Sequence, residues 1–143
     1  MENTIIKFAM GTCGIASGTQ DILNLFDKEL SRLNYPARLV RTGCMGHCYA
    51  EPTISITLPD QEPVYFGNVN EERAREIIDH FLLKGDRTEG IIPPEGDFSR
   101  KQFKIALKNC GEIDPEEIQE YIDREGYKAL MKCLTSMKPE KVI

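Results

Sequence analysis

Two cysteine-bearing loops, each placed directly after a run of β-branched and apolar residues, constrain the fold of this chain more than any other feature. The run TIIKFAM (4–10) is followed by Cys13, and the run ARLVRT (37–42) is followed by Cys44 and Cys48. Short runs of this composition predict buried strands. The Cys13 loop, at the end of the first strand, is expected to approach the second cysteine loop across the sheet.

The remainder of the first 85 residues alternates between helical and strand periodicity. Apolar residues recur every three or four positions over 19–33, which predicts an amphipathic helix that ends at the Asn-Tyr-Pro stretch 34–36. Isoleucines alternate with Thr and Ser over 53–57, which indicates a half-exposed strand, and 64–66 returns as the second strand of a hairpin. Asn70 is placed to cap a last helix. The order β-α-β-β-β-α predicts an α/β fold.

The C-terminal third of the sequence has a different texture. Residues 86–97 contain two adjacent prolines and two glycines without periodicity, so they predict a linker. Beyond the linker, 98–143 is predicted to be a short helical extension. One helix is expected over 114–126, with Asp114 as its N-cap, and another over 127–137. The second helix is predicted to have an inner apolar face that contains Ala129, Leu130, Cys133 and Leu134.

The composition limits the class of protein. The hydrophobic content is 41%, the charged content is 29% and the net charge is -5, which is ordinary for a soluble domain and argues against a nucleic-acid surface. No apolar run approaches the roughly 18 residues of a membrane span, and the N-terminus lacks the features of a signal peptide. A cytoplasmic protein without membrane insertion is therefore expected. No Walker loop, dinucleotide fingerprint, serine triad or paired-carboxylate site is present, so no catalytic residues are predicted.

The five cysteines favour metal binding over a disulfide framework, because their number is odd and their spacing uneven. Cys44 and Cys48 are spaced C-x3-C around Gly46, which lets two thiolates reach one iron and lets the backbone offer N–H groups to sulfur. Zinc would suit the same pair, but it also requires four N or S ligands. Cys110 and Cys133 lie in helix-like surroundings and are expected to be small buried side chains.

Two alternatives remain open for the residues near these loops. Cys13 occupies a strand-to-helix turn, where a redox nucleophile also sits, but a dithiol motif would need a cysteine at Ala16. A thiol-disulfide enzyme is therefore the weaker interpretation. His47 is a further possible ligand, since imidazole replaces thiolate in some clusters, although a loop histidine is more often solvated.

Four segments carry a resemblance to a known family. GTCGIASG, TGCMGHCYAEPTISI, VYFGNV and HFLLKG resemble the N-terminal thioredoxin-like ferredoxin domain of the flavin-binding subunits of NAD(P)H-linked hydrogenases and complex I-type NADH dehydrogenases. The stretch from KQFKIALKNCG to the end resembles the opening of the flavoprotein body of the same subunits. The resemblance implies a thioredoxin-like ferredoxin domain over 1–85, a linker over 86–97 and the truncated start of the flavoprotein body over 98–143.

The resemblance also implies a set of cluster ligands. Cys44 and Cys48 match the second cysteine pair of the ferredoxin domain, and Cys13 matches the later member of the first pair. The earlier member falls at position 8, where this chain has Phe8. If Cys13 is instead the earlier member, its partner falls at Gly18, which is not a ligand either. A 2Fe-2S cluster would thus lack one ligand, and Ser17, His47 or a cysteine of a partner subunit are candidates to replace it.

Two functions follow from the resemblance. The first is an electron-transfer module of an NAD(P)H-linked oxidoreductase complex that carries a 2Fe-2S cluster. The second is a cluster-free docking domain that attaches the flavoprotein subunit to a neighbour. In the family, FMN and NAD(P)H bind in the part of the body that would follow residue 143, so this chain is expected to be an N-terminal fragment or short paralogue that is not catalytic alone. Its expected partners are other subunits of the complex.

Overall fold

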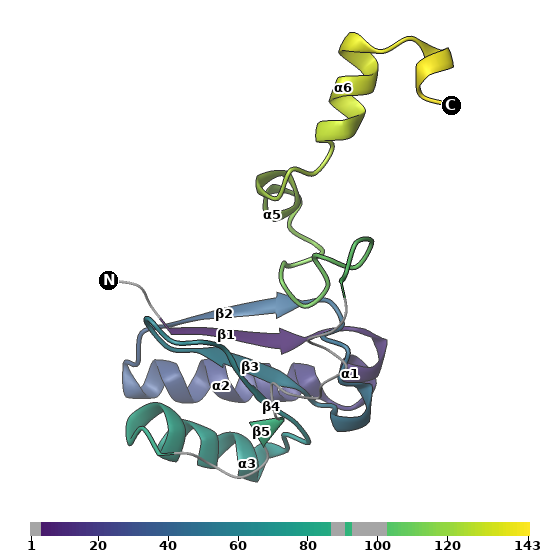
Figure 1. Cartoon of the computed structure of the whole chain (residues 1–143). Coiled ribbons are helices and arrows are strands. Elements are labelled where there is room, and N and C mark those ends of the chain that lie inside the picture. Colours follow the sequence, from purple (N-terminus) through teal and green to yellow (C-terminus); the bar gives the residue numbers. More distant parts are fainter. Residues whose placement is uncertain (1–3, 87–90, 93–102) are drawn as a thin grey trace.

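The computed structural model describes residues 4–86, 91–92 and 103–143. Its centre is a five-stranded mixed sheet in the order β2-β1-β3-β4-β5 (Figure 1). The strands are β1 (Thr4–Ala9), β2 (Ala37–Thr42), β3 (Ile54–Thr57), β4 (Val64–Phe66) and β5 (Ile91–Ile92). β1 and β2 are parallel, and the other neighbouring pairs are antiparallel. The predicted α/β class is therefore confirmed.

Helices cover one face of this sheet (Figure 1). They are α1 (Thr12–Ala16), α2 (Thr19–Leu33) and α3 (Glu71–Glu76), and α3 continues as a π-helical segment, η2 (Ile77–Leu83). The long helix α2 ends as predicted at Asn34, which adopts a left-handed conformation at φ 50°. Asn70 caps α3 as predicted, because its side-chain oxygen accepts a hydrogen bond from the Arg73 N–H at 2.9 Å.

The hydrophobic core lies between the sheet and these helices. Phe8 of β1 packs edge-on against Phe26 of α2, with ring centroids 5.5 Å apart, and Phe66 of β4 packs similarly against Phe81 of η2 at 5.1 Å. The core also contains Ile6, Ile22, Leu30, Ile54, Ile56, Val69, Ala74, Ile77, Ile78 and Leu82. One apolar layer thus joins the sheet to α2, α3 and η2.

The sheet differs from the sequence prediction in two places. β3 is buried on both faces: Ser55 is 2% exposed, because it is paired between Lys7 of β1 and Tyr65 of β4, whose longer side chains flank it. The predicted linker 86–97 contributes β5, whose Ile92 pairs with Tyr65. The open edge of β4 has unpaired backbone N–H and C=O groups, and the two isoleucines of β5 can form hydrogen bonds with them. A strand of two residues is too short for any periodicity in the sequence to predict it.

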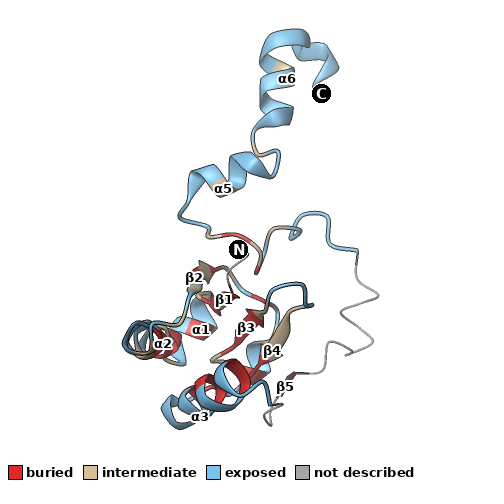
Figure 2. Cartoon of the chain, turned by 90° about the vertical axis from the view of Figure 1, so that its left-hand side faces the viewer, coloured by how far each residue is buried: buried red, intermediate tan, exposed pale blue. Residues whose placement is uncertain are grey.

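Residues 103–143 extend from the opposite side of the sheet (Figures 1 and 2). They contain α5 (Ile118–Asp123), α6 (Lys128–Ser136) and a final 3-10 turn, η3 (Pro139–Lys141). The helix predicted over 114–126 is shorter than expected, because Asp114 accepts the Glu116 N–H in a turn of its own. None of the helices in the described part of the chain is long and apolar enough to cross a lipid bilayer.

Within the described residues 103–143, the contacts with the sheet come from Glu112, Ile113 and Glu120. Glu112 pairs with Lys7 of β1 at 2.9 Å, Glu120 pairs with Arg38 of β2 at 2.8 Å, and Ile113 is buried. α6 stands clear of the sheet and is exposed (Figure 2). The prediction of an inner apolar face on α6 is therefore wrong for this structure: Leu130 and Leu134 are 51% and 74% exposed.

Candidate functional site

The predicted cysteines gather at one end of the sheet because β1 and β2 are parallel. The last residues of these two strands, Ala9 of β1 and Thr42 of β2, are paired, so the loops that follow the strands leave the sheet side by side. Cys13 lies in α1, directly after β1. Cys44 follows β2, and Cys48 begins a short 3-10 turn, η1 (Cys48–Ala50). All three thiols are free and exposed.

The two loops are in direct contact through a glycine. A Cβ added to Gly11 would lie only 3.1 Å from the Cβ of Cys44, which is tighter than ordinary van der Waals contact, so the two loops lie close together here. Gly46, in a left-handed conformation at φ 90°, directs its backbone N–H to the Cys44 sulfur at 3.3 Å. The N–H to sulfur bond expected from the C-x3-C spacing is thus present.

The three thiols do not form a compact ligand set. Within residues 4–86, 91–92 and 103–143, no three His, Cys, Asp or Glu side chains are close enough together to hold a single metal ion. Phe8, where the resemblance places a fourth thiol, is fully buried on the helix-covered side of the sheet against Phe26. A thiol at position 8 would enter the core, whereas the other three are at the surface.

Ser17 and His47, the two candidates within this chain for the missing ligand, lie in different environments. Ser17 is exposed and ends α1. The His47 ring packs edge-on against Tyr65 at 5.4 Å and Tyr49 at 6.2 Å, and its Nδ1 is buried with no hydrogen-bond partner. Burial, and secondarily the charge of Lys104, lowers the pKa of His47 below its usual 6.5. The imidazole is therefore neutral near pH 7, which is the form that binds metals.

The structure brings one further cysteine to this region. Gly111 adopts a left-handed conformation at φ 77°, and a Cβ added to it would lie 3.2 Å from Met45 Cα and 3.5 Å from the carbonyl oxygen of Cys44. The neighbouring Cys110 is free and exposed, so the prediction that it is buried is wrong. Its place beside the cysteine loop depends on a contact between segments more than sixty residues apart in the sequence. Periodicity and spacing carry no indication of such a contact.

Cys133, the fifth cysteine, is partly exposed and belongs to a different part of the extension. Its thiol contacts the sulfur of Met137, the residue that follows α6, at 3.9 Å. The prediction of a fully buried Cys133 is therefore also wrong.

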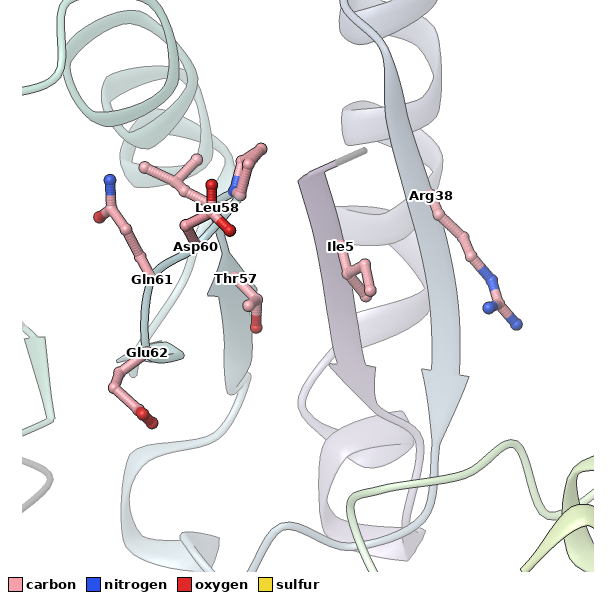
Figure 3. A pocket seen from close by; sticks show the side chains of 8 residues that line it. Ile5, Arg38, Thr57, Leu58, Asp60, Gln61 and Glu62 are labelled. Atoms are coloured by element: carbon pink, nitrogen blue, oxygen red, sulfur yellow. The ribbon is translucent and has the colours of Figure 1, made fainter. Parts of the chain in front are cut away.

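A pocket lies at the other end of the sheet from the cysteine loops (Figure 3). Its volume is about 640 Å³, and it is lined by Ile5, Arg38, Thr57, Leu58, Pro59, Asp60, Gln61 and Glu62. Figure 3 shows the Arg38 side chain directed away from Asp60 and Glu62, and the Arg38 guanidinium is paired with Glu120. This pocket contains no thiol or imidazole and is separate from the cysteine loops.

Comparison with known proteins places these features in context. No protein-family model matches the chain. The chain is 42% identical over 91 residues to the NADP-reducing hydrogenase subunit HndB of Solidesulfovibrio fructosivorans, which covers 63% of this chain and 72% of HndB. It is also 52% identical over 44 residues to the NADP-reducing hydrogenase subunit HndC of the same organism, which covers 31% of this chain but 9% of HndC.

Solved structures agree on the fold. A thioredoxin-like [2Fe-2S] ferredoxin from Aquifex aeolicus superimposes with a TM-score of 0.55 at 20% identity, over 67% of this chain and 94% of the ferredoxin. A second structure of the wild-type ferredoxin gives the same TM-score and identity over 66% of this chain and 100% of the ferredoxin. The chain therefore has the thioredoxin-like ferredoxin fold that the sequence resemblance implied.

Proposed function

Because the chain belongs to the family of the NADP-reducing hydrogenase subunit HndB, we propose that it is an electron-transfer module of a hydrogenase complex of this kind. It carries no catalytic residues of its own in this proposal. The reactions of FMN and NAD(P)H take place in a partner subunit, and this chain passes electrons between that partner and another redox centre in the cytoplasm.

The arrangement of the thiols is the observation that supports this proposal. Cys13, Cys44 and Cys48 are free and exposed at one end of a ferredoxin-type sheet, on loops that touch at Gly11. These are the residues that would hold a 2Fe-2S cluster, and such a cluster supplies one-electron redox chemistry when bound. Gly46 would donate its N–H to the Cys44 sulfur, which stabilises the more negative, reduced state. The exposed position of the loops would let a redox partner approach closely.

The C-terminal extension suggests a second role for this chain, in the assembly of the complex. We propose that residues 1–85, together with β5, form the ferredoxin-like domain, that the rest of 86–97 is a linker, and that 98–143 corresponds to the start of a flavoprotein body. The exposed apolar side chains of α6, which are Leu130, Met131 and Leu134, would then contact another subunit of the complex.

A cluster-free docking domain is the alternative, and one observation favours it. The described residues contain no ready-made group of three ligands, and position 8 is filled by a core phenylalanine. In this alternative the fold and the extension are retained for assembly alone. Electron transfer would then bypass this chain.

Anaerobic purification separates the two functions. The chain is purified without oxygen, or reconstituted with iron and sulfide, and its iron, acid-labile sulfide and visible spectrum are measured. We expect two irons per chain and a charge-transfer absorption that bleaches on reduction. A colourless chain with no iron, including after reconstitution, would leave only the docking function.

A further inference from the structure

We propose that two copies of this chain pair through their C-terminal extensions, with α5 of one copy packed against α6 of the other. This inference rests on the assembly role proposed above, and it names the subunit that α6 contacts as a second copy of the chain. The surface concerned lies on α5 and α6, on the part of the extension that stands away from the cysteine loops (Figure 2).

Both helices of the extension expose apolar side chains at helical spacing. On α5, Ile118, Tyr121 and Ile122 lie three and four positions apart, so they share one face of the helix. They are 64%, 41% and 44% exposed. The same spacing gives α6 an apolar stripe whose members are at least half exposed: Tyr127, Leu130, Met131 and Leu134. Single exposed apolar residues are ordinary, but apolar faces on two neighbouring helices mark an interaction surface.

The two stripes are held together by the turn between the helices. The Tyr121 ring packs edge-on against the Tyr127 ring, with centroids 5.1 Å apart. The Gly126 N–H donates to the Tyr121 carbonyl oxygen at 2.8 Å, and a Cβ added to Gly126 would collide with Tyr121. The stripes of α5 and α6 therefore form one preorganised surface, which lowers the entropy cost of binding.

The two halves of the extension carry opposite charge. Residues 112–125 contain seven acidic side chains and one basic side chain, whereas residues 126–143 contain four lysines and one glutamate. Glu116 and Glu117 are exposed just before α5, and Lys132 and Lys138 are exposed on and just after α6. Each half thus combines an apolar stripe with charges of one sign.

Such a surface is complementary to itself when two copies run antiparallel. The acidic α5 half of each copy then faces the basic α6 half of the other, whereas a parallel pair would place like charges together. Two-fold symmetry repeats each contact, so the pairing closes at two copies. The apolar stripes would lie at the centre of the interface and the charges at its rim, which is the usual arrangement.

This complementarity favours a second copy over an unrelated subunit, because the chain itself carries both halves of the match. The position of α6 also permits the approach. α6 stands clear of the sheet (Figures 1 and 2), so a second copy can reach it without displacing the ferredoxin-like domain.

Sedimentation equilibrium of the full chain over a range of concentrations tests the pairing. A reducing agent is present, so that exposed thiols do not cross-link the copies. We expect a reversible dimer whose dissociation constant rises with salt, because salt screens the charges at the rim. Leu130→Asp combined with Leu134→Asp should raise this constant about tenfold or more, since it places carboxylates at the centre of the interface. Leu83→Asp is the matched control, because Leu83 is 47% exposed in η2 of the ferredoxin-like domain.

A charge-reversal experiment tests the antiparallel arrangement. One variant combines Glu116→Lys with Glu117→Lys, and the other combines Lys132→Glu with Lys138→Glu. Each variant alone should pair more weakly than wild type, because its two copies now place like charges together. An equimolar mixture of the two should form a heterodimer, because every contact again joins opposite charges. All four side chains are exposed, and far-UV circular dichroism checks that each variant is folded.

The outcomes separate this inference from the proposed electron-transfer function. A wild type that stays monomeric at all concentrations would overturn the pairing, and so would a dimer that Leu130→Asp with Leu134→Asp weakens no more than Leu83→Asp does. A mixture of the reversed variants that fails to associate would overturn the antiparallel match. Iron analysis of the same samples is an independent readout. A dimer without iron would uphold the pairing while refuting electron transfer, and an iron-containing monomer would do the reverse.

Discussion

Replacing Phe8 with cysteine tests whether the missing ligand belongs in the first strand. Phe8 is fully buried, and its ring lies 5.5 Å from the Phe26 ring at an interplanar angle of 75°. Truncating a buried phenylalanine to alanine costs about 3–5 kcal/mol, and cysteine retains one sulfur atom of the lost volume. We therefore expect Phe8→Cys to reduce the free energy of unfolding by about 3 kcal/mol, which includes the loss of the edge-on contact with Phe26.

This loss is large compared with the total stability of a domain, which is about 5–15 kcal/mol. Urea unfolding followed by circular dichroism measures it, and iron analysis after reconstitution shows whether the new thiol binds metal. Phe103→Cys is the matched control, because Phe103 is 90% exposed and its replacement should change stability by no more than about 0.5 kcal/mol. The reasoning would be refuted if Phe8→Cys were as stable as wild type, or if it bound more iron.

Three further predictions concern the loops and the extension. A Cβ on Gly14 would collide with the Ala9 carbonyl oxygen, so Gly14→Ala should lower the thermal midpoint sharply; an unchanged midpoint would contradict the close packing of α1 on β1. Because burial lowers the pKa of His47 below 6.5, the unfolded state binds a proton more readily, and stability should fall as the pH drops below about 6.5 until the folded pKa is reached. Between neutral and acidic pH, the free energy of unfolding measured in urea should fall less for His47→Gln than for wild type. Equal falls in the two proteins would exclude His47 protonation as the cause. Glu112→Gln removes the partly exposed pair with Lys7, so it should change overall stability by less than about 1 kcal/mol while proteolysis of 103–143 becomes faster; an unchanged cleavage rate would show that this pair does not hold the extension.

The sequence by itself determined the elements whose causes are local. The apolar stripe of α2 and its end at Asn34 are set by side chains within one or two turns of each other. The same holds for the Asn70 cap, whose partner is three residues away, and for the C-x3-C loop with its glycine. The resemblance carried by GTCGIASG and its companion segments was sufficient to identify the thioredoxin-like ferredoxin fold, because short loop motifs at fixed strand ends are specific to it.

The tertiary structure decided which residues meet across long separations. In the folded chain the Phe8 side chain points into the core, where a cluster ligand cannot lie. Which side of β1 is buried depends on which face of the sheet the helices cover. The tertiary structure paired Ile92 with Tyr65, which made a strand out of a predicted linker. It also placed Gly111 against Met45 and Cys44 of the second cysteine loop. Each of these contacts joins segments that carry no pattern in common, so only the packed chain brings them together.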